Sequence, residues 1–220
     1  MSEQLFGIYG ASGCGRGIMP LAREMVLKQG ISLDRLVFID DGDNNPQSIN
    51  GHQILKYTDF LAIDASERWV SIAIANSIVR EKIAMRMHED RVLSWTIQAN
   101  NCVIMDEVLI GEGAILSPFV TLTSNIRIGR HFQANLYSYV EHDCIIGDYV
   151  TFAPSVRCNG NIVIEDHAYI GTGAVIKQGT PDKPLVIGRG AVVGMGAVVT
   201  KSVPAGVTVV GNPAKPFTKS

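Results

Sequence analysis

The stretch YSYVEHDCIIGDYV, residues 137–150, places His142 between two carboxylates, Glu141 and Asp143. An imidazole has a reference pKa of about 6.5, so its neutral form can accept a proton near pH 7. A carboxylate beside the ring can hold one tautomer and make the other nitrogen a better proton acceptor. The triplet is therefore a candidate general base, with Asp143 as the orienting carboxylate and Glu141 as the alternative.

Four other histidines compete with His142, and a single histidine in a turn is more often a solvated side chain than a catalyst. His52 and His88 fall in a predicted loop and at a predicted helix end, so we interpret both as surface residues. His131 has no acidic neighbour. His167 follows an acidic residue and is the strongest alternative base.

A second group of candidate functional residues lies in the first half of the chain. The run LFGIYG predicts a buried strand that ends in the glycine-rich turn GASGCGRG, and helical spacing follows over 15–29. RLVFIDD and WVSIAIAN predict two more strands, and a helix is expected over 77–90. This order indicates a small parallel sheet, whose ligands gather where the strands end. Those ends carry the turn, then Asp40 and Asp41, then Asn76.

The glycine-rich turn by itself would suggest a dinucleotide-dependent oxidoreductase. However, GASGCGRG lacks the G-x-G-x-x-G spacing, and the α/β segment is too short for a full two-part cofactor fold. We regard this as the weakest interpretation.

From about residue 97 the apolar residues recur every six positions. Thirteen consecutive positions of one frame are apolar although only 46% of the chain is hydrophobic. They are Ile104, Ile110, Leu116, Leu122, Ile128, Ala134, Val140, Ile146, Phe152, Cys158, Ile164, Ile170 and Ile176. After a break at KQGTPDKPLV the pattern resumes with IGRGAV. A six-residue period predicts a parallel β-solenoid with three flat faces and about 18 residues per coil. The domains expected are residues 1–96 and 97–220.

Composition excludes several classes of partner. A net charge of −2 provides no basic surface for nucleic acid or an anionic membrane. No apolar run is long enough to span a bilayer, and the N-terminus lacks the features of a signal peptide. The four cysteines have neither CxxC nor metal-ligand spacing, so we expect free thiols, no metal and a cytoplasmic protein.

The solenoid pattern resembles the hexapeptide-repeat acyltransferases, which implies a left-handed parallel β-helix, homotrimers, and acetyl-CoA bound between neighbouring solenoids. The N-terminal segments IYGASGCG, FIDD and AIANSIVREKI, together with the ending VVGNPAKPF, narrow the match. In combination they resemble the bacterial nucleotide-sugar acetyltransferases, close relatives of the sialic-acid O-acetyltransferases. The fold implied is a small Rossmann-like α/β domain followed by the all-β helix.

This resemblance assigns roles to particular residues. It implies that His142 is the catalytic base and that Asp143 assists it. The substrate-binding positions implied are Ser12, Gly13, Cys14, Asp40, Asp41 and Ala75. Three further positions are implied to contact acetyl-CoA: Thr151, Thr172 and Met195. Relatives often have His where this chain has Cys14, Gly where it has Ala75, and a second His where it has Thr151.

The resulting hypothesis is direct N-acetylation of a UDP- or dTDP-linked 4-amino-4,6-dideoxy sugar by acetyl-CoA, in surface-glycan or lipopolysaccharide biosynthesis. A histidine base serves a hydroxyl acceptor equally well, so sugar or sialic-acid O-acetylation is the first alternative. A non-catalytic solenoid scaffold is the second. The sequence does not identify the nucleotide, the sugar stereochemistry or the acyl donor.

Overall fold

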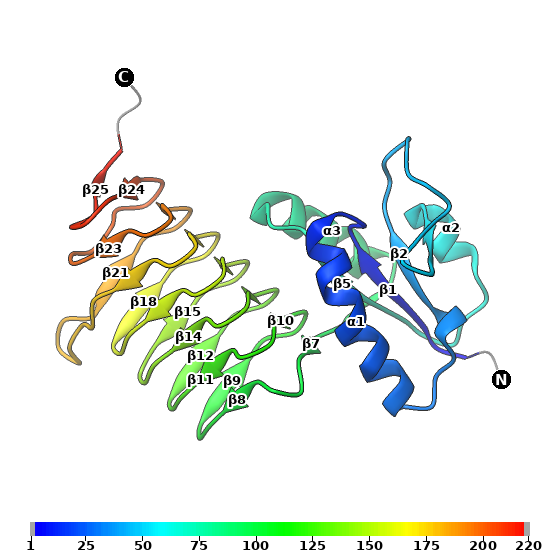
Figure 1. Ribbon diagram of the computed structural model, residues 1–220, viewed down its shortest axis with the longest axis horizontal. Coiled ribbons are helices and arrows are strands. Elements are labelled where there is room, and N and C mark those ends of the chain that lie inside the picture. Colours follow the sequence, from blue (N-terminus) through cyan, green and yellow to red (C-terminus); the bar gives the residue numbers. More distant parts are fainter. Residues whose placement is uncertain (1–2, 218–220) are drawn as a thin grey trace. The chain divides into compact units, whose positions relative to one another are not determined.

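The computed structural model describes residues 3–217, which divide into two compact units (Figure 1). The first unit ends at Ile97 and the second begins at Gln98. No helix of the described residues is long and apolar enough to cross a membrane.

The first unit is a six-stranded sheet in the order β3-β4-β2-β1-β5-β6. All neighbouring strands run parallel except β3, which is antiparallel to β4. The strands are β1 (Leu5–Tyr9), β2 (Leu36–Ile39), β3 (Ser48–Ile49), β4 (His52–Leu55), β5 (Arg68–Ile72) and β6 (Leu93–Ser94). The helices are α1 (Gly13–Lys28), α2 (Tyr57–Ala62) and α3 (Ser77–Glu89), with the 3-10 turn η1 (Leu33–Arg35).

Helix α1 forms because its apolar residues recur at helical spacing. Ile18, Met19, Ala22 and Val26 lie on one buried face, and the central strand β1 is buried along its whole length. The expected helices over 15–29 and 77–90 are therefore confirmed. The interpretation of His52 as a surface residue is wrong, because the side chain is 5% exposed and its Nδ1 lies 3.1 Å from the carbonyl oxygen of Leu36.

The second unit is a three-faced solenoid of short parallel strands, visible in Figure 1 as a stack of coils. Face 1 consists of β7 (Ile97–Gln98), β10 (Ile115–Leu116), β13 (Gln133–Ala134), β16 (Thr151–Phe152), β19 (Tyr169–Ile170), β22 (Val192–Val193), β24 (Thr208–Val210) and the antiparallel β25 (Lys215–Pro216).

Face 2 consists of β8 (Val103–Ile104), β11 (Thr121–Leu122), β14 (Tyr139–Val140), β17 (Arg157–Cys158), β20 (Val175–Ile176) and β23 (Val198–Val199). Face 3 consists of β9 (Val108–Ile110), β12 (Ile126–Ile128), β15 (Ile145–Ile146), β18 (Ile162–Ile164) and β21 (Leu185–Ile187). The chain visits the faces in this order in every coil, so we name the three corners the 1–2, 2–3 and 3–1 edges.

The six-residue apolar frame forms the core of the solenoid. Each of the thirteen frame residues is the last residue of a strand, and from Leu116 onward each is at most 5% exposed. Phe132 and Phe152 meet edge to face inside the solenoid, with ring centroids 5.2 Å apart. The predicted packing of large aliphatic residues inside a three-faced solenoid is confirmed.

Truncation of Phe152 tests this core. Phe152 is fully buried, so Phe152→Ala leaves a cavity and is expected to lower the free energy of unfolding by about 3 to 5 kcal/mol. Leu109→Ala, at a side chain that is 59% exposed on β9, is the control and is expected to change it by less than about 1 kcal/mol. Denaturant unfolding of both variants measures the difference. Equal losses would contradict the core assignment.

Candidate active site

His142 and Asp143 lie together at the 2–3 edge, between β14 and β15. The imidazole Nδ1 is 2.8 Å from Asp143 Oδ2, and both side chains are partly exposed, at 43% and 49%. With the proton on Nδ1, the ring donates to Asp143 and its Nε2 is left as a proton acceptor. Asp143 itself turns the corner, with a φ of 57°. The arrangement suits a general base held by a carboxylate.

Gly160 supports the imidazole from the next coil. A Cβ built on Gly160 would lie 2.5 Å from His142 Cε1 and 2.6 Å from Nε2, so any larger residue would displace the ring. A backbone hydrogen bond also joins the two coils here, because Asn161 N donates to His142 O at 3.0 Å. The imidazole is thus held by the carboxylate of Asp143 on one side and by the backbone of Gly160, which has no side chain, on another.

Polar groups beside Gly160 are also fixed. Tyr139 OH donates to Asn159 Oδ1 at 2.8 Å, and Asn159 Nδ2 donates to the carbonyl oxygen of Ile176 at 2.9 Å. The buried thiol of Cys144 contacts Asn159 O at 3.2 Å. All four cysteines are free, as expected. These bonds hold three successive coils in register at the 2–3 edge.

In the first unit, Asp40 connects the glycine-rich turn to the end of β2. Its Oδ2 accepts from Ala11 N at 3.0 Å, and its Oδ1 accepts from Gly42 N at 3.0 Å and from Asn45 Nδ2 at 2.8 Å. Burial raises the pKa of the Asp40 carboxyl, but these hydrogen bonds outweigh burial and hold the pKa below its usual value.

Both carboxylate oxygens of Asp41 have partners within the protein. Tyr9 OH donates to Asp41 Oδ2 at 2.5 Å, Tyr57 N donates to Oδ1 at 2.8 Å, and Arg86 Nη1 lies 3.5 Å from Oδ2. Burial first, and then Asp41, raises the pKa of Tyr9, so its hydroxyl keeps its proton. Both oxygens of Asp41 therefore organise the loops after β1, β2 and β4.

The remaining predicted substrate positions lie at the same edge of the sheet. Ser12 precedes α1 in extended conformation without a side-chain capping bond, and Ser12 and Gly13 are exposed. Cys14 is partly buried, and burial raises the pKa of its thiol. Ala75 is exposed after β5, beside Asn76, whose Oδ1 accepts from Ile78 N and Val79 N at 3.1 Å each. The structure thus brings the turn, the aspartates and Ala75 to one carboxyl edge.

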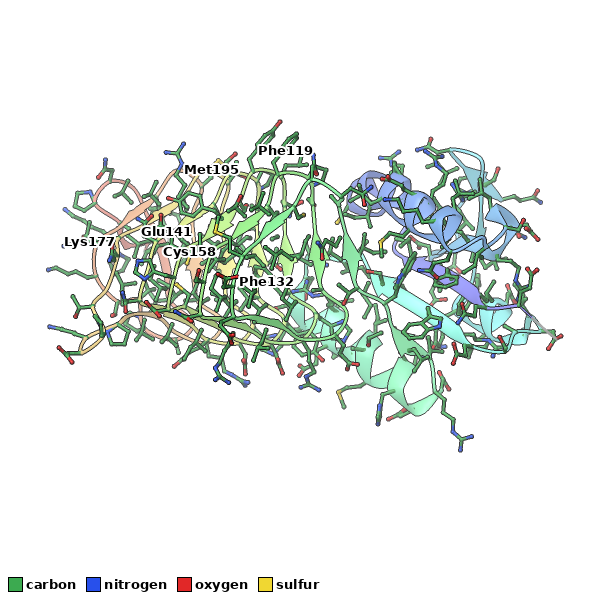
Figure 2. The ribbon with its side chains drawn as sticks, turned by 90° about the horizontal axis from the view of Figure 1, so that it is seen from below. Phe119, Phe132, Glu141, Cys158, Lys177 and Met195 are labelled. Atoms are coloured by element: carbon green, nitrogen blue, oxygen red, sulfur yellow. The ribbon has the colours of Figure 1, made fainter. Side chains whose placement is uncertain are left out.

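The predicted acetyl-CoA positions do not share the edge that carries His142. Thr172 and Met195 are exposed at the 1–2 edge, and Figure 2 shows Met195 on the same side as Phe119. Thr151 lies on β16 of face 1 and is 2% exposed. Among residues 3–217, no group of three His, Cys, Asp or Glu side chains is placed to hold a metal ion.

Sequence reasoning missed two residues that shape these sites. Arg80 is fully buried and donates from Nη1 to Ile74 O at 2.6 Å and Ala75 O at 3.2 Å, fixing the end of β5. No pattern in the sequence distinguishes it from a surface arginine of α3. Gly160 was detectable, because it lies 18 residues, or one coil, after His142.

Comparison with known proteins places the chain in a family. Residues 6–87 match the PglD N-terminal domain. Over 216 residues, 98% of this chain and 97% of the relative, the sequence is 50% identical to a GDP-perosamine N-acetyltransferase of Escherichia coli O157:H7. The chain belongs to the hexapeptide-repeat nucleotide-sugar N-acetyltransferases. The family inferred from the hexads and the N-terminal motifs is confirmed, and the chain is an acetyltransferase of nucleotide-linked amino sugars.

Solved structures share the fold of this chain. WeeI of Acinetobacter baumannii AYE is 61% identical, with a TM-score of 0.94 over 97% of this chain and 100% of that one. The acetyltransferase domain of PglB of Neisseria gonorrhoeae FA1090, solved with acetyl coenzyme A, is 24% identical, with a TM-score of 0.85 over 99% and 100%. The predicted fold, a small α/β domain followed by a left-handed β-helix, is confirmed.

Gly160→Ala tests whether Gly160 holds the His142 ring, the candidate base of this acetyltransferase, in place. The methyl group would displace the His142 ring, and a shift of about 1 Å at a catalytic group can cost roughly a hundredfold in rate. We expect kcat to fall by about that factor, with a circular dichroism spectrum like the wild type. Leu109→Ala, at an exposed side chain of β9 that packs against neither residue, is the control. Unchanged turnover in Gly160→Ala would contradict the proposed support.

Asp40→Asn tests the hydrogen bonds by which Asp40 joins the loops after β1 and β2. A carboxyl whose pKa is lowered by folding stabilises the folded state above its unfolded pKa of about 3.9, and that stabilisation is lost as pH falls through the lower folded value. The variant is therefore expected to melt at a lower temperature than wild type at pH 7, with the gap closing below about pH 4. Asp43→Asn, at an exposed ion pair with Lys56, should show no such pH-dependent gap. A gap that is constant with pH would be the contrary result.

Proposed function

We propose that the chain transfers acetyl from acetyl-CoA to the 4-amino group of a GDP-linked 4-amino-4,6-dideoxy sugar of the perosamine type. The observation that carries this proposal is the 50% identity, over nearly the whole of both chains, to an enzyme named for GDP-perosamine. That relative favours guanosine diphosphate over the UDP or dTDP expected from the sequence. The carboxyl edge of the first unit, with its exposed turn and Asp40, is the proposed site for the nucleotide.

In the proposed mechanism, His142 is the general base. Asp143 accepts the Nδ1 proton, so Nε2 takes a proton from the sugar amine as the nitrogen attacks the thioester carbonyl carbon. The C–N bond forms, and the carbonyl oxygen carries the negative charge of a tetrahedral intermediate. When the C–S bond breaks, the imidazolium returns its proton to the departing thiolate. The products are the N-acetylated sugar and CoA, and no acetyl-enzyme is formed.

A homotrimer is the assembly we propose, and the edges of the solenoid support it. His142 lies at the 2–3 edge, whereas Thr172 and Met195 lie at the 1–2 edge. One acetyl-CoA molecule that touches all three residues therefore needs two copies of the chain, one contributing each edge. Because acetyl-CoA and nucleotide sugars are cytoplasmic metabolites, we propose a cytoplasmic enzyme that supplies surface-glycan synthesis. Neither nucleic acid nor a membrane is part of this proposal.

A thiol-release assay with acetyl-CoA tests the proposal directly. GDP-, UDP- and dTDP-linked 4-amino-4,6-dideoxy sugars are compared as acceptors, and the GDP sugar is expected to give the largest kcat/KM. His142→Ala should lower kcat by about 10² to 10⁴-fold, the usual contribution of a general base. Asp143→Asn should lower kcat about tenfold with KM unchanged, because the ring loses its fixed orientation.

Asp182→Asn, an exposed carboxylate in the loop after β20, is the matched control and is expected to behave as wild type. A preference for a UDP or dTDP sugar would overturn the nucleotide assignment. Full activity in His142→Ala would instead leave His167 as the base to examine. Acetylation at a hydroxyl, seen by mass spectrometry of the product, would favour the O-acetyltransferase alternative.

A further inference from the structure

Arg80, on α3, is a charged side chain inside the first unit that the reaction described above does not use. It is fully buried, although arginine is among the residues least often found in a protein interior. Removing a guanidinium from water is costly unless hydrogen bonds and a favourable charge environment compensate for the lost hydration. The groups around Arg80 therefore indicate what its burial provides.

The guanidinium of Arg80 fixes the loop between β5 and α3. Its Nη1 donates to the carbonyl oxygen of Ile74 at 2.6 Å and to that of Ala75 at 3.2 Å. The backbone of the same residue donates to the carbonyl oxygen of Asn76 at 2.9 Å, within the first turn of α3. One residue thus binds three successive carbonyl groups of this loop, and Ala75 is one of the positions expected to contact the nucleotide sugar.

The loop that Arg80 fixes packs directly against the start of the glycine-rich turn. Ala73 N donates to Tyr9 O at 2.8 Å, which joins the ends of β5 and β1. A Cβ built on Gly10 would lie 3.1 Å from Ala73 O and 3.3 Å from Ile74 Cγ1, and Gly10 has a φ of 107°, so the contact requires glycine. A shift of the loop after β5 would therefore move the turn as well.

The positive charge of Arg80 also acts on the glycine-rich turn. Burial raises the pKa of the Cys14 thiol, and the charge of Arg80 opposes part of that increase, so the guanidinium lies within electrostatic range of the turn. Asp40 and Asp41 place two negative charges at the same edge of the sheet, and within residues 3–217 Arg86 pairs only with Asp41. A bound diphosphate would be repelled by these carboxylates, and a nearby positive charge offsets that repulsion.

We infer that Arg80 is a positioning residue for the nucleotide: it holds the loop after β5 against the glycine-rich turn, and its buried charge favours binding of the diphosphate. The inference rests on the proposed function, because it takes the carboxyl edge of the sheet as the nucleotide site. Arg80 is 0% exposed, so it acts through the backbone carbonyl groups and through its electric field rather than by touching the ligand. A charge in the protein interior acts over several ångströms because little water screens it.

Two variants separate the charge of Arg80 from its hydrogen bonds. Arg80→Lys keeps the charge, whereas Arg80→Gln keeps an amide donor without the charge. Titration calorimetry gives the Kd of GDP and of guanosine, which lacks the phosphates. We expect Arg80→Gln to raise the Kd of GDP about tenfold more than that of guanosine, and Arg80→Lys to raise both by a similar factor. In the thiol-release assay, both variants should raise KM for the nucleotide sugar and leave kcat and the KM for acetyl-CoA unchanged.

Lys82→Gln, which removes an exposed charge from the same helix, is the matched control. Equal losses of GDP and guanosine affinity in Arg80→Gln, or no loss in either variant, would overturn the inference. Wild type provides a check that needs no variant: GDP must bind at least about tenfold more tightly than guanosine, and equal binding would also overturn it. The proposed acceptor can fail separately. If UDP or dTDP binds more tightly than GDP, the same comparison is made with that nucleotide and its nucleoside, because all three share the diphosphate.

Discussion

Parallel pairing of each strand with the strand one coil later is the constraint that positions the candidate catalytic residues. Thr121, Tyr139, Arg157 and Val175 are paired in sequence, each 18 residues from the next. Because paired strands lie about 4.8 Å apart, side chains at the same corner of successive coils must stack. A histidine at one corner therefore has its neighbours decided by the residues 18 positions before and after it. His142 lies against Gly160 for this reason.

The corners of the solenoid impose a second requirement, a backbone with positive φ, which Asp143 also meets. At the 2–3 edge the chain turns through residues with positive φ: Glu107, Asn125, Asp143 and Asn161. Short polar side chains such as Asp and Asn tolerate this conformation better than most residues. Asp143 thus turns the backbone and, as the next residue after His142, places an oxygen 2.8 Å from Nδ1. One residue type, Asp, therefore suits both the positive φ of the corner and the hydrogen bond to His142.

The solenoid could be predicted from the sequence because its period is local and is repeated many times. Frame residues such as Leu116 and Ile176 needed only their spacing to be assigned to the core. The α/β unit has no sequence repeat, and the burial of its polar residues Arg80 and His52 was not predicted. Arg80 can be buried because it donates to the carbonyl oxygens of Ile74 and Ala75, and His52 lies within hydrogen-bond distance of the carbonyl oxygen of Leu36. A single sequence does not show which backbone oxygens will meet a buried side chain.

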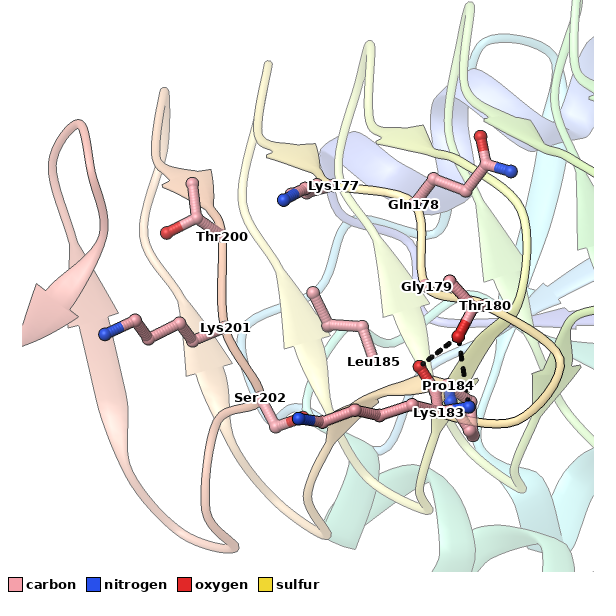
Figure 3. A pocket seen from close by; sticks show the side chains of 10 residues that line it. All are labelled: Lys177, Gln178, Gly179, Thr180, Lys183, Pro184, Leu185, Thr200, Lys201 and Ser202. Atoms are coloured by element: carbon pink, nitrogen blue, oxygen red, sulfur yellow. Dashed lines mark hydrogen bonds between the residues drawn. The ribbon is translucent and has the colours of Figure 1, made fainter.

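The interruption of the period at KQGTPDKPLV is where the 2–3 edge gains a feature that regular coils lack. A regular hexad after β20 would have continued directly into face 3, with no room for a loop. The inserted residues instead return to pair with Gly160 and Asn161, the two residues that also contact His142. The departure from the repeat therefore gives the coil after His142 backbone hydrogen bonds to a loop that lies outside the regular six-residue pattern and lines the pocket drawn in Figure 3.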